Sequence, residues 1–492
     1  MTFLGIDLGT SALKAVLVDG DQTILAQAEI PLGISSPRPG WWEQDPRDWW
    51  DALVGALAEL RAARPVAFRE VKALGLSGQM HGAVLVDRSG QAIRAAILWN
   101  DARAQAECSE LEASVPDLAR IAGVAAMPGF TAPKLLWLKR NEPESYARIW
   151  KVLSPKDYLR LRLSGDAATD MCDAAGTLWL DEAARDWSEP ILAATGLSRE
   201  AMPRLAEGSE PTGELAPALI AEWGIGGPVV IAGGAGDAAG AGVGIGAVED
   251  GDAFISLGTS AQFFVTDDRY RPRPDSGLHA FAHALPGRWF RMAAMLNGAS
   301  CLQWTARLLG EPDIEILLAR AEAAYAGPSR LIFLPYLSGE RTPHNDPFAR
   351  GVFFGLDPAT EPVELVQATL EGVALSLAEA QGLLRSAGVR LGPVAVVGGG
   401  ARSRFWMQML AHALGREVIR HAGGESGPAF GAARLARLAL TGEAPGAVCV
   451  KPRPLDVLEP DPTLHALYAE RFEAFRSLYR ALKPEFRRAQ PH

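Results

Sequence analysis

The sequence predicts an α/β protein built from two lobes of similar fold. The main observation is a repeat: Gly-Ile-Asp-Leu-Gly-Thr-Ser at residues 5–11 returns as Phe-Ile-Ser-Leu-Gly-Thr-Ser at residues 254–260. Each copy sets a Gly-Thr-Ser turn between two apolar runs, the pattern of a β-hairpin. Elsewhere strand-like runs alternate with amphipathic helices, as in α/β proteins, and 492 residues suffice for two or three domains. We therefore expect one lobe over residues 1–248 and a second over residues 249–492.

The other elements follow from local patterns, taken in chain order. Asp45 and Pro46 mark the start of a helix whose apolar face is spaced at three and four residues. Further strands are predicted at residues 71–76, 95–99, 229–232 and 394–397, and further helices at 362–384 and 463–482. Polar or glycine-rich segments follow each of these strands, which is where α/β proteins place ligands.

Composition excludes several classes of protein. The net charge is −10 and no basic stripe is visible, so we expect no nucleic-acid partner. The four cysteines are far apart and form no CxxC pair, which favours a reducing cytoplasm over a disulfide framework or a zinc site. The first residues lack the pattern of a signal peptide. Residues 227–248 are apolar but include eight glycines, which indicates a packed loop and helix rather than a membrane span.

The chain contains only eight lysines, and none of them follows a glycine. The G-x-x-x-x-G-K-[ST] phosphate loop is therefore absent. If the protein binds ATP, it needs another device.

The repeated turn is a candidate for that device. Consecutive backbone N–H groups and two hydroxyls in a Gly-Thr-Ser turn can bind phosphate, although an ordinary hairpin is the simpler reading of either copy alone. Only the first copy carries an acid, Asp7, where the second has Ser256. A carboxylate beside a phosphate turn suits Mg²⁺, which prefers carboxylate, water and phosphate oxygens.

Three more sites carry candidate chemistry. Asp237 lies alone in a glycine-rich run, either as a helix N-cap or as a general base that accepts a hydroxyl proton. The small residues around it are expected to let a substrate approach the backbone. The run Gly398–Ser403 follows a strand and opens a helix, where glycine permits close packing of a ring or a phosphate. His81 lies at a strand end, as a ligand-binding or a structural histidine.

Taken together, these motifs resemble those of the FGGY carbohydrate kinases, a branch of the actin, hexokinase and heat-shock chaperone ATPase superfamily. The resemblance spans essentially the whole chain. The two turns resemble the phosphate hairpins, residues 398–403 the adenosine loop, and Gly-Phe-Thr-Ala-Pro-Lys-Leu-Leu-Trp at 129–137 a family signature. Within the family, residues 78–82, 99–103 and 335–344 are similar to the branch that phosphorylates xylulose. Glycerol kinases have an Arg-Glu pair where Met80 and His81 stand here.

The resemblance implies a two-lobed actin/hexokinase-like (ribonuclease H-like) fold with a central nucleotide cleft. It also implies ATP-dependent phosphorylation of D-xylulose at O5, with Asp237 as general base and Mg²⁺ near Asp7. It assigns the sugar contacts to Met80, His81, Trp99, Asp101 and Asp237. It assigns the nucleotide contacts to Gly9, Thr10, Ser11, Lys14, Gly258, Thr259, Ser260, Gly399, Gly400, Ala401 and Ser403. We also expect the enzyme to be cytoplasmic. A homodimer, as in some relatives, is a further expectation.

Three alternatives stay open. One is an FGGY kinase for ribulose, gluconate or a related polyol, because Ala238 stands where some relatives have an asparagine. Another is a non-catalytic sugar sensor of the same fold, against which the presence of both Asp7 and Asp237 argues. A chaperone-type ATPase would need a substrate-binding domain after the second lobe, and the sequence shows none.

Overall fold

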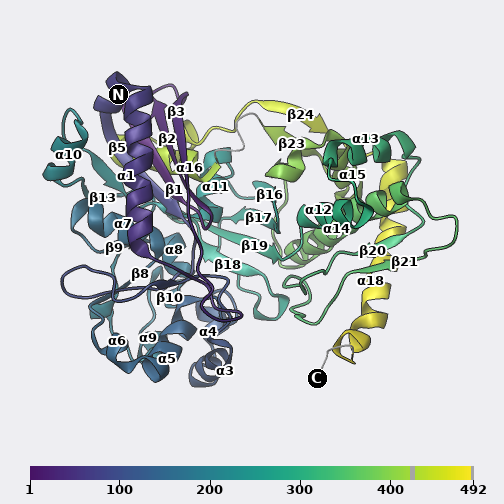
Figure 1. Ribbon diagram of the computed structural model, residues 1–492, viewed down its shortest axis with the longest axis horizontal. Coiled ribbons are helices and arrows are strands. Elements are labelled where there is room, and N and C mark those ends of the chain that lie inside the picture. The colour runs from purple at the N-terminus through teal and green to yellow at the C-terminus, as the bar shows by residue number, and fades with distance from the viewer. Residues whose placement is uncertain (422–426, 489–492) are drawn as a thin grey trace.

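The first lobe of the molecule is built on a seven-stranded sheet (Figure 1). The computed structural model describes residues 1–421 and 427–488. The sheet has the order β13-β14-β5-β1-β2-β3, with β15 beside β5. Its strands are β1 (Thr2–Leu8), β2 (Ala12–Asp19), β3 (Ile24–Pro31), β5 (Val71–Gly78), β13 (Pro211–Glu214), β14 (Val230–Ala232) and β15 (Ala235–Gly236).

A second seven-stranded sheet, with the order β18-β19-β17-β16-β22-β23-β24, forms the other lobe. Its strands are β16 (Ala253–Leu257), β17 (Ala261–Asp267), β18 (His279–Ala282), β19 (Trp289–Met295), β22 (Val394–Val397), β23 (Val418–His421) and β24 (Pro454–Leu458).

The two sheets share one strand pattern. In the first, β1, β2 and β3 pair antiparallel, and β5 and β14 extend the sheet in parallel from β1. In the second, β16, β17 and β19 pair antiparallel, and β22 and β23 extend it in parallel from β16. The predicted duplication is confirmed by this topology, and both Gly-Thr-Ser turns join the first two strands of their sheet.

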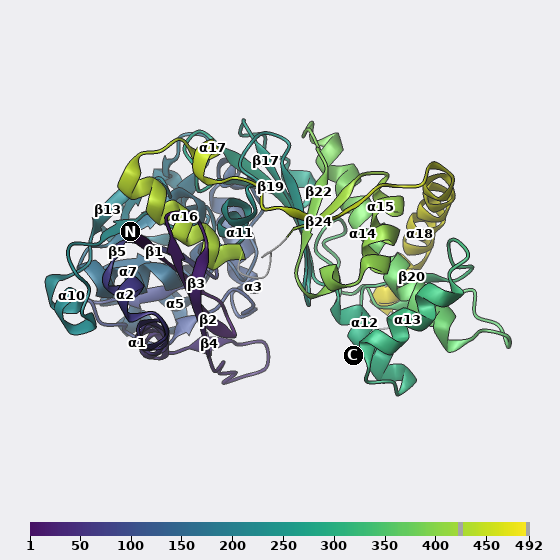
Figure 2. The ribbon, with the colours of Figure 1, turned by 90° about the horizontal axis from the view of Figure 1, so that it is seen from above.

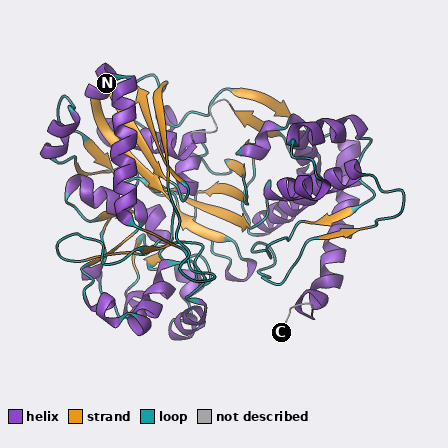
Figure 3. Cartoon of the chain, in the orientation of Figure 1, coloured by secondary structure: helices purple, strands orange, loops and turns teal. Residues whose placement is uncertain are grey.

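Helices and a small subdomain cover the first sheet (Figure 3). Asp45 caps α1 by accepting from the Arg47 N–H, and the apolar face of α1 buries Trp49, Leu53 and Leu57. The helices of this lobe are α1 (Pro46–Ala63), α2 (Pro65–Arg69), α3 (Gln105–Ser114), α4 (Leu118–Ile121), α5 (Thr131–Asn141), α6 (Pro143–Ala147), α7 (Pro155–Ser164), α8 (Met171–Ala175), α9 (Glu189–Thr195), α10 (Pro217–Trp223) and α11 (Asp237–Ile245). Short strand pairs complete it: β4 (Glu43–Gln44) with β7 (Ala96–Ile97), β6 (Val84–Val86) with β8 (Lys151–Leu153), β9 (Ala168–Asp170) with β12 (Arg204–Ala206), and β10 (Leu180–Asp181) with β11 (Asp186–Trp187).

The second sheet packs on long helices. The helix predicted at 362–384 is α14 (Pro362–Ser386), which is buried along most of its length, and the one predicted at 463–482 is α18 (Pro462–Arg488). The remaining elements are α12 (Ser300–Leu309), α13 (Ile314–Ala324), α15 (Arg404–Leu414), α16 (Gly427–Thr441), α17 (Pro445–Val448) and the pair β20 (Ile332–Leu334) and β21 (Val352–Phe354).

One helix of the second half of the chain returns to the first sheet. Figure 2 shows α16 beside β1 and β5 rather than with α14, α15 and α18. A Cβ atom on Gly5 would lie 1.9 Å from the Ala429 carbonyl oxygen, and one on Gly75 would lie 2.0 Å from the Ala432 carbonyl oxygen. Glycine at both strand positions is what lets this helix approach so closely. The predicted lobe boundary after residue 248 falls between α11 and β16 and stays a prediction.

The glycine-rich run at 227–248 forms β14, β15 and α11 in the body of the first lobe. Within residues 1–421 and 427–488, no helix combines the length and apolar character needed to cross a membrane. The strand predicted at 95–99 shrinks to the two residues of β7, because the chain turns at Trp99 and Asn100.

Candidate active site

Two acids from the first lobe lie next to its phosphate hairpin. Asp7 is on β1 just before the turn, and Asp237 is the first residue of α11. Burial, and after it the negative charge of Asp237, raise the pKa of Asp7 to about 7, although Lys14 acts in the opposite direction. Burial also raises the pKa of Asp237 to about 6. The predicted pair of acids is therefore brought together, with proton affinities well above those of ordinary carboxylates.

The helix-cap reading of Asp237 does not hold. Gly236 is the N-cap of α11, and within residues 1–421 and 427–488 the Asp237 side chain accepts only from the adjacent Ala238 N–H, at 2.8 Å. That contact leaves most of the carboxylate's lone pairs free for another donor.

The first hairpin turn is tied to the region predicted to bind sugar. The Thr10 hydroxyl donates to Gln79 Oε1 at 3.0 Å and accepts from Trp99 Nε1 at 2.9 Å. Gln44 joins them, since its Nε2 donates to the Thr10 carbonyl and its Oε1 accepts from Gln79 Nε2. Trp99 and the turn are thus neighbours, as expected of a sugar site beside a phosphate site. The Thr10 hydroxyl, however, is engaged by protein groups.

The segment with Met80 and His81 has an unusual backbone. His81 has φ +68°, which is rare for a non-glycine residue and costs about 1–3 kcal/mol. Its Nδ1 lies 2.7 Å from the Gly176 carbonyl oxygen, and its ring packs on Phe130 with centroids 4.3 Å apart. Because a carbonyl only accepts, Nδ1 carries the hydrogen and Nε2 is left as an acceptor. Burial lowers the pKa of His81 to about 3, which keeps the ring neutral.

The family-like signature at 129–137 holds this strained segment in place. Lys134 is fully buried and donates from Nζ to the carbonyl oxygens of His81, at 2.9 Å, and Ile97, at 3.2 Å. The Thr131 hydroxyl donates to the same His81 carbonyl at 3.1 Å. Sequence reasoning quoted this signature without giving it a role. Its function here is to support the loop that carries Met80 and His81.

Asp101 is buried and its carboxylate is fully engaged. Oδ1 accepts from the N–H and Nε of Arg103, and Oδ2 accepts from Arg103 Nη2 and from the Trp42 N–H at 2.6 Å. Two donors on each oxygen match the lone pairs of a carboxylate. Asp101 thus orients Arg103, whose guanidinium lies 3.8 Å from the ring centre of Trp41.

The glycines before Asp237 accommodate protein atoms rather than open a path for a substrate. A Cβ on Gly233 would lie 2.2 Å from the Glu207 carbonyl oxygen, and one on Gly236 would lie 2.6 Å from Met80 Sδ. Gly234 has φ +93°, a conformation that favours glycine. The consequence for the site is that Gly236, the N-cap of α11 and the residue before Asp237, packs directly against Met80.

The predicted nucleotide residues of the first lobe lie on the hairpin itself. Gly9 and Ser11 form its turn with Thr10, and Ser11 is exposed. Lys14 stands opposite Asp7 in the β1–β2 register, is partly exposed and pairs with Glu29 at 3.8 Å.

The corresponding residues of the second lobe differ in how freely they face solvent. Gly258, Thr259 and Ser260 form the second turn, with the two hydroxyl residues exposed. In the loop after β22, Gly399 has open space around its Cα, whereas Gly400 packs on Leu257 of β16. Ala401 is buried, and the Ser403 hydroxyl caps α15 by accepting from the Trp406 N–H.

A buried ionic cluster behind the site has no counterpart in the sequence-based expectations. Lys156 Nζ lies 2.5 Å from Asp157, 2.7 Å from Asp170 and 3.3 Å from Asp173, and all four side chains are buried. The Lys156 side chain also packs under Gly78 and Gly234, which lead to the sugar segment and to Asp237. The local sequence around Lys156, Ser-Pro-Lys-Asp-Tyr, gives no signal of this burial.

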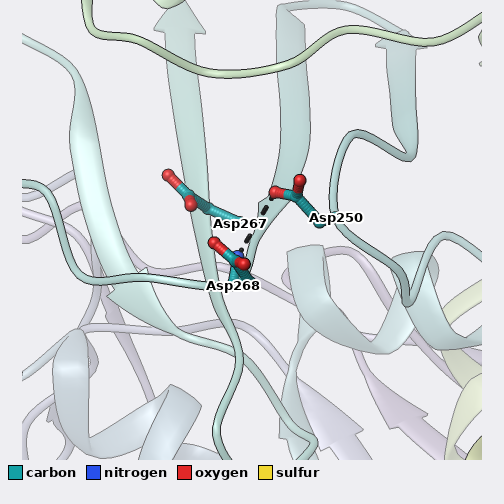
Figure 4. A group of neighbouring side chains, drawn as sticks. All are labelled: Asp250, Asp267 and Asp268. Atoms are coloured by element: carbon teal, nitrogen blue, oxygen red, sulfur yellow. Dashed lines mark hydrogen bonds between the residues drawn. The ribbon is translucent and has the colours of Figure 1, made fainter.

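A second group of acids lies away from the cleft residues, at the start of the second lobe. Figure 4 shows Asp250, Asp267 and Asp268 with their carboxylates close together. Asp267 pairs with Arg291 at 3.2 Å and with Arg271 at 3.5 Å, and Asp268 also pairs with Arg271. Arginines therefore neutralise this group, and it is better described as an ion-pair network than as a metal site.

Asp7 fits a divalent cation better. Its Oδ1 is buried without a hydrogen-bond partner among the described residues, and so is the Ser77 hydroxyl on the neighbouring strand. Unsatisfied buried oxygens are uncommon in folded proteins. The raised pKa shows that a second negative charge nearby is costly, and a cation would relieve that cost.

These features define a class of protein: a two-lobed α/β phosphotransferase of the actin/hexokinase type, with duplicated phosphate hairpins. The models of the N-terminal and C-terminal domains of the FGGY family of carbohydrate kinases match residues 2–244 and 253–440. The chain belongs to the FGGY family of carbohydrate kinases.

Its relatives include the xylulose kinase of Escherichia coli (strain K12), which is 48% identical over 98% of this chain and 99% of that protein. Among solved structures, a xyloylose kinase from Brucella ovis is 45% identical with a TM-score of 0.96, covering 98% of this chain and all of that one. Xylulose kinase from Rhodospirillum rubrum is 29% identical with a TM-score of 0.92, covering 99% and 100%.

Proposed function

We propose that this chain is an ATP-dependent kinase that phosphorylates D-xylulose at O5. The names of its full-length relatives support the substrate, since the match extends over almost the entire length of both proteins. The structural observation that carries the proposal is the packing of Gly236, which directly precedes Asp237, against Met80, with Asp7 and the first hairpin as neighbours. This arrangement sets a base next to both a sugar segment and a phosphate turn.

In this mechanism Asp237 accepts the proton of the O5 hydroxyl as that oxygen attacks the γ-phosphorus of ATP and ADP leaves. A pKa of about 6 makes its carboxylate a stronger base than an ordinary aspartate while still ionised near neutral pH. His81 Nε2 and the wall formed by Met80 orient the sugar, and the two Gly-Thr-Ser turns bind the phosphates from the two lobes. Lobe closure would exclude water as a competing acceptor.

Asp7, with Ser77 and water, would hold Mg²⁺. When bound, the ion neutralises charge on the phosphate oxygens of ATP. Asp101 and Trp99 position the sugar site: Asp101 through Arg103, and Trp99 through Thr10. The nucleotide residues of the second lobe, Gly258–Ser260 and Gly399–Ser403, would receive the rest of ATP.

The cellular setting is a proposal on the same footing. All four cysteines are free and buried, which suits a reducing cytoplasm. A homodimer and the absence of a nucleic-acid partner remain expectations from the sequence.

The test is turnover with ATP on a panel of D-xylulose, D-ribulose, L-xylulose, gluconate and glycerol. We expect D-xylulose to have the highest kcat/KM and the Asp237→Asn variant to lose about 10²–10⁴-fold in kcat while still binding ATP. Asp313→Asn, which changes a helix-capping acid of α13 far from the cleft residues, serves as the matched control and should keep wild-type turnover. Higher activity on gluconate or ribulose would replace the proposed substrate, and sugar binding without turnover would indicate a sensor.

A further inference from the structure

A buried histidine of the second lobe has no partner. His279 opens β18, its side chain is 2% exposed, and neither ring nitrogen forms a hydrogen bond within the described part of the chain. Buried imidazoles nearly always satisfy at least one nitrogen. The position of the unsatisfied His279 imidazole in the fold suggests why it has no partner.

His279 lies beside the sugar segment of the first lobe. Its ring centre is 6.0 Å from that of Phe130, the same ring on which His81 packs at 4.3 Å. His81 also acts electrostatically on His279, lowering its pKa beyond the larger effect of burial. Two neutral imidazoles from different lobes therefore meet around one aromatic ring.

The strand that carries His279 is fixed to the first lobe. The Ala280 N–H donates to the Gly123 carbonyl oxygen at 3.0 Å, and the Ala282 N–H donates to Glu182 Oε2 at 2.6 Å. In Figure 1, β18 lies where the two lobes join. The position of His279 relative to His81 is thus set by direct hydrogen bonds between the lobes.

The Arg341 guanidinium is an unpaired cation close to His81 and His279. It faces both imidazoles closely enough for its charge to lower the pKa of each. Within residues 1–421 and 427–488 its guanidinium has no hydrogen bond or ion pair. Its loop is held against the second sheet, since the Thr342 N–H donates to the Ala294 carbonyl and the Thr342 hydroxyl donates to the Gly277 carbonyl, each at 3.1 Å.

The acid next to Arg341 does not satisfy it. Glu340 Oε1 accepts from the Leu296 and Arg341 backbone N–H groups, and its Oε2 accepts from Asn297 Nδ2. Glu340 therefore braces the loop, and the Arg341 guanidinium remains a donor without an acceptor.

We propose that His279 and Arg341 form the second lobe's half of the sugar site and hydrogen-bond the ketone end of the substrate. This inference rests on the proposed function. The location follows from packing: His279 and His81 share the Phe130 ring, and Arg341 lies close enough to both imidazoles to lower the pKa of each.

The chemistry of the three side chains fits that end of a ketose. His81 Nε2 can only accept, so it suits a hydroxyl; Arg341 can only donate, so it suits a carbonyl oxygen. The C1 hydroxyl and the C2 carbonyl of a 2-ketose supply one of each. Neutral His279 offers one donor and one acceptor and can serve either group. An unreduced ketose would satisfy every member of the set.

The experiment measures D-xylulose affinity by calorimetry without nucleotide, together with KM for ATP and Tm, in His279→Ala and Arg341→Met. We expect each to weaken D-xylulose binding about tenfold or more, with KM for ATP within about twofold of wild type. His279→Gln, which keeps a donor and an acceptor, should recover part of the affinity and covers the case in which His279→Ala does not fold. A pentitol inhibitor, which lacks the carbonyl, should lose less affinity in Arg341→Met than D-xylulose does.

Two nearby residues of the second lobe provide matched controls: His283 directly follows β18, and Arg291 lies on β19. His283 is buried but accepts from the Leu285 N–H, and Arg291 is buried but pairs with Asp267. His283→Ala and Arg291→Met should lower Tm without changing D-xylulose affinity. Wild-type sugar affinity in both a folded His279→Ala and Arg341→Met would overturn this inference. Failure of the proposed function would look different, because the wild-type protein itself would then not turn over D-xylulose.

Discussion

The two phosphate hairpins share a fold but not a chemistry. In the first, Asp7 stands opposite Lys14; at the corresponding place in the second, Ser256 stands opposite Gln262. A charged pair in one copy is thus a neutral pair in the other. A single magnesium-bound polyphosphate needs one carboxylate, and a second acid would only repel the phosphate oxygens.

The turns are also braced in different ways. Side chains of the sugar region, Gln79 and Trp99, bind the Thr10 hydroxyl in the first turn. The second turn is held through its backbone, where the Gly298 N–H donates to the Thr259 carbonyl and the Ala299 N–H to the Gly258 carbonyl. The first hairpin is therefore connected to the predicted sugar region, whereas the second is connected to the segment that leads into α12 of its own lobe. The two hairpins therefore have the same backbone fold, but their side chains have different roles.

The largest expected effect comes from removing the acid that only the first hairpin carries. Asp7→Asn should lower kcat by about 10²-fold or more and abolish the normal Mg²⁺ dependence, since the variant lacks the charge that would hold the ion. Ser256→Ala should stay within about threefold of wild type. Steady-state turnover of D-xylulose across a magnesium titration checks both. Equal losses in the two variants would mean that the hairpins share the metal role.

The next effect concerns the link between turn and sugar. Thr10→Val removes the partner of both Gln79 and Trp99, and unsatisfied buried groups cost about 1–3 kcal/mol. We expect KM for D-xylulose to rise about tenfold and Tm to fall. Thr259→Val, at the exposed counterpart, should leave the sugar KM and Tm unchanged. If Thr259→Val weakened sugar binding as much as Thr10→Val, the conclusion that only the first turn is linked to the sugar region would be wrong.

Local sequence patterns were enough to predict both hairpins, the α/β class and the two acids. Asp7 and Asp237 each sit in a short motif whose glycines set the backbone around them, so the information lies within a few residues. The same holds for the helix beginning at Pro46, where cap and apolar spacing agree.

The partners of side chains were harder to predict, because they depend on packing between distant segments. The Asp101 carboxylate is engaged by Arg103 and the Trp42 N–H, and the Thr10 hydroxyl by residues some 70 to 90 positions away. His279 is 198 residues from His81, and only the pairing of β18 with the first lobe brings them together. Nothing in the local sequence of either one signals that contact.

The adenosine loop offers a smaller test within the second lobe. Gly399 has open space around it, whereas a Cβ on Gly400 would lie 2.5 Å from Leu257 Cγ, at the end of the strand that leads into the second hairpin. Gly399→Ala should keep the wild-type Tm and weaken ATP binding a few-fold. Gly400→Ala should lower Tm, since overpacking costs about 1–3 kcal/mol. Calorimetric ATP titration and thermal melts distinguish the two, and a Tm loss in Gly399→Ala would contradict the open placement of that residue.

The smallest expected effect is on the stability of the metal-free protein. Removing the Asp7 charge should lower activity but raise this stability. The pKa of Asp7 is about 7 in the folded chain and 3.8 as its ordinary value. Between these values the folded state binds more protons than the unfolded state, so the free energy of unfolding falls as pH rises, and the full penalty is present above pH 7.

Asp7→Asn has no charge to bury. In chelator at pH 8 its Tm should therefore exceed that of wild type by about 2–5 °C, and the gain should vanish as pH falls toward 4. Ser256→Ala should follow the wild-type pH dependence throughout. Adding Mg²⁺ and ATP should reverse the order, because only wild type holds the ion that offsets its buried charge. A lower Tm for Asp7→Asn in chelator at pH 8 would show that Asp7 stabilises the fold, and that the first hairpin keeps its acid for structure as much as for catalysis.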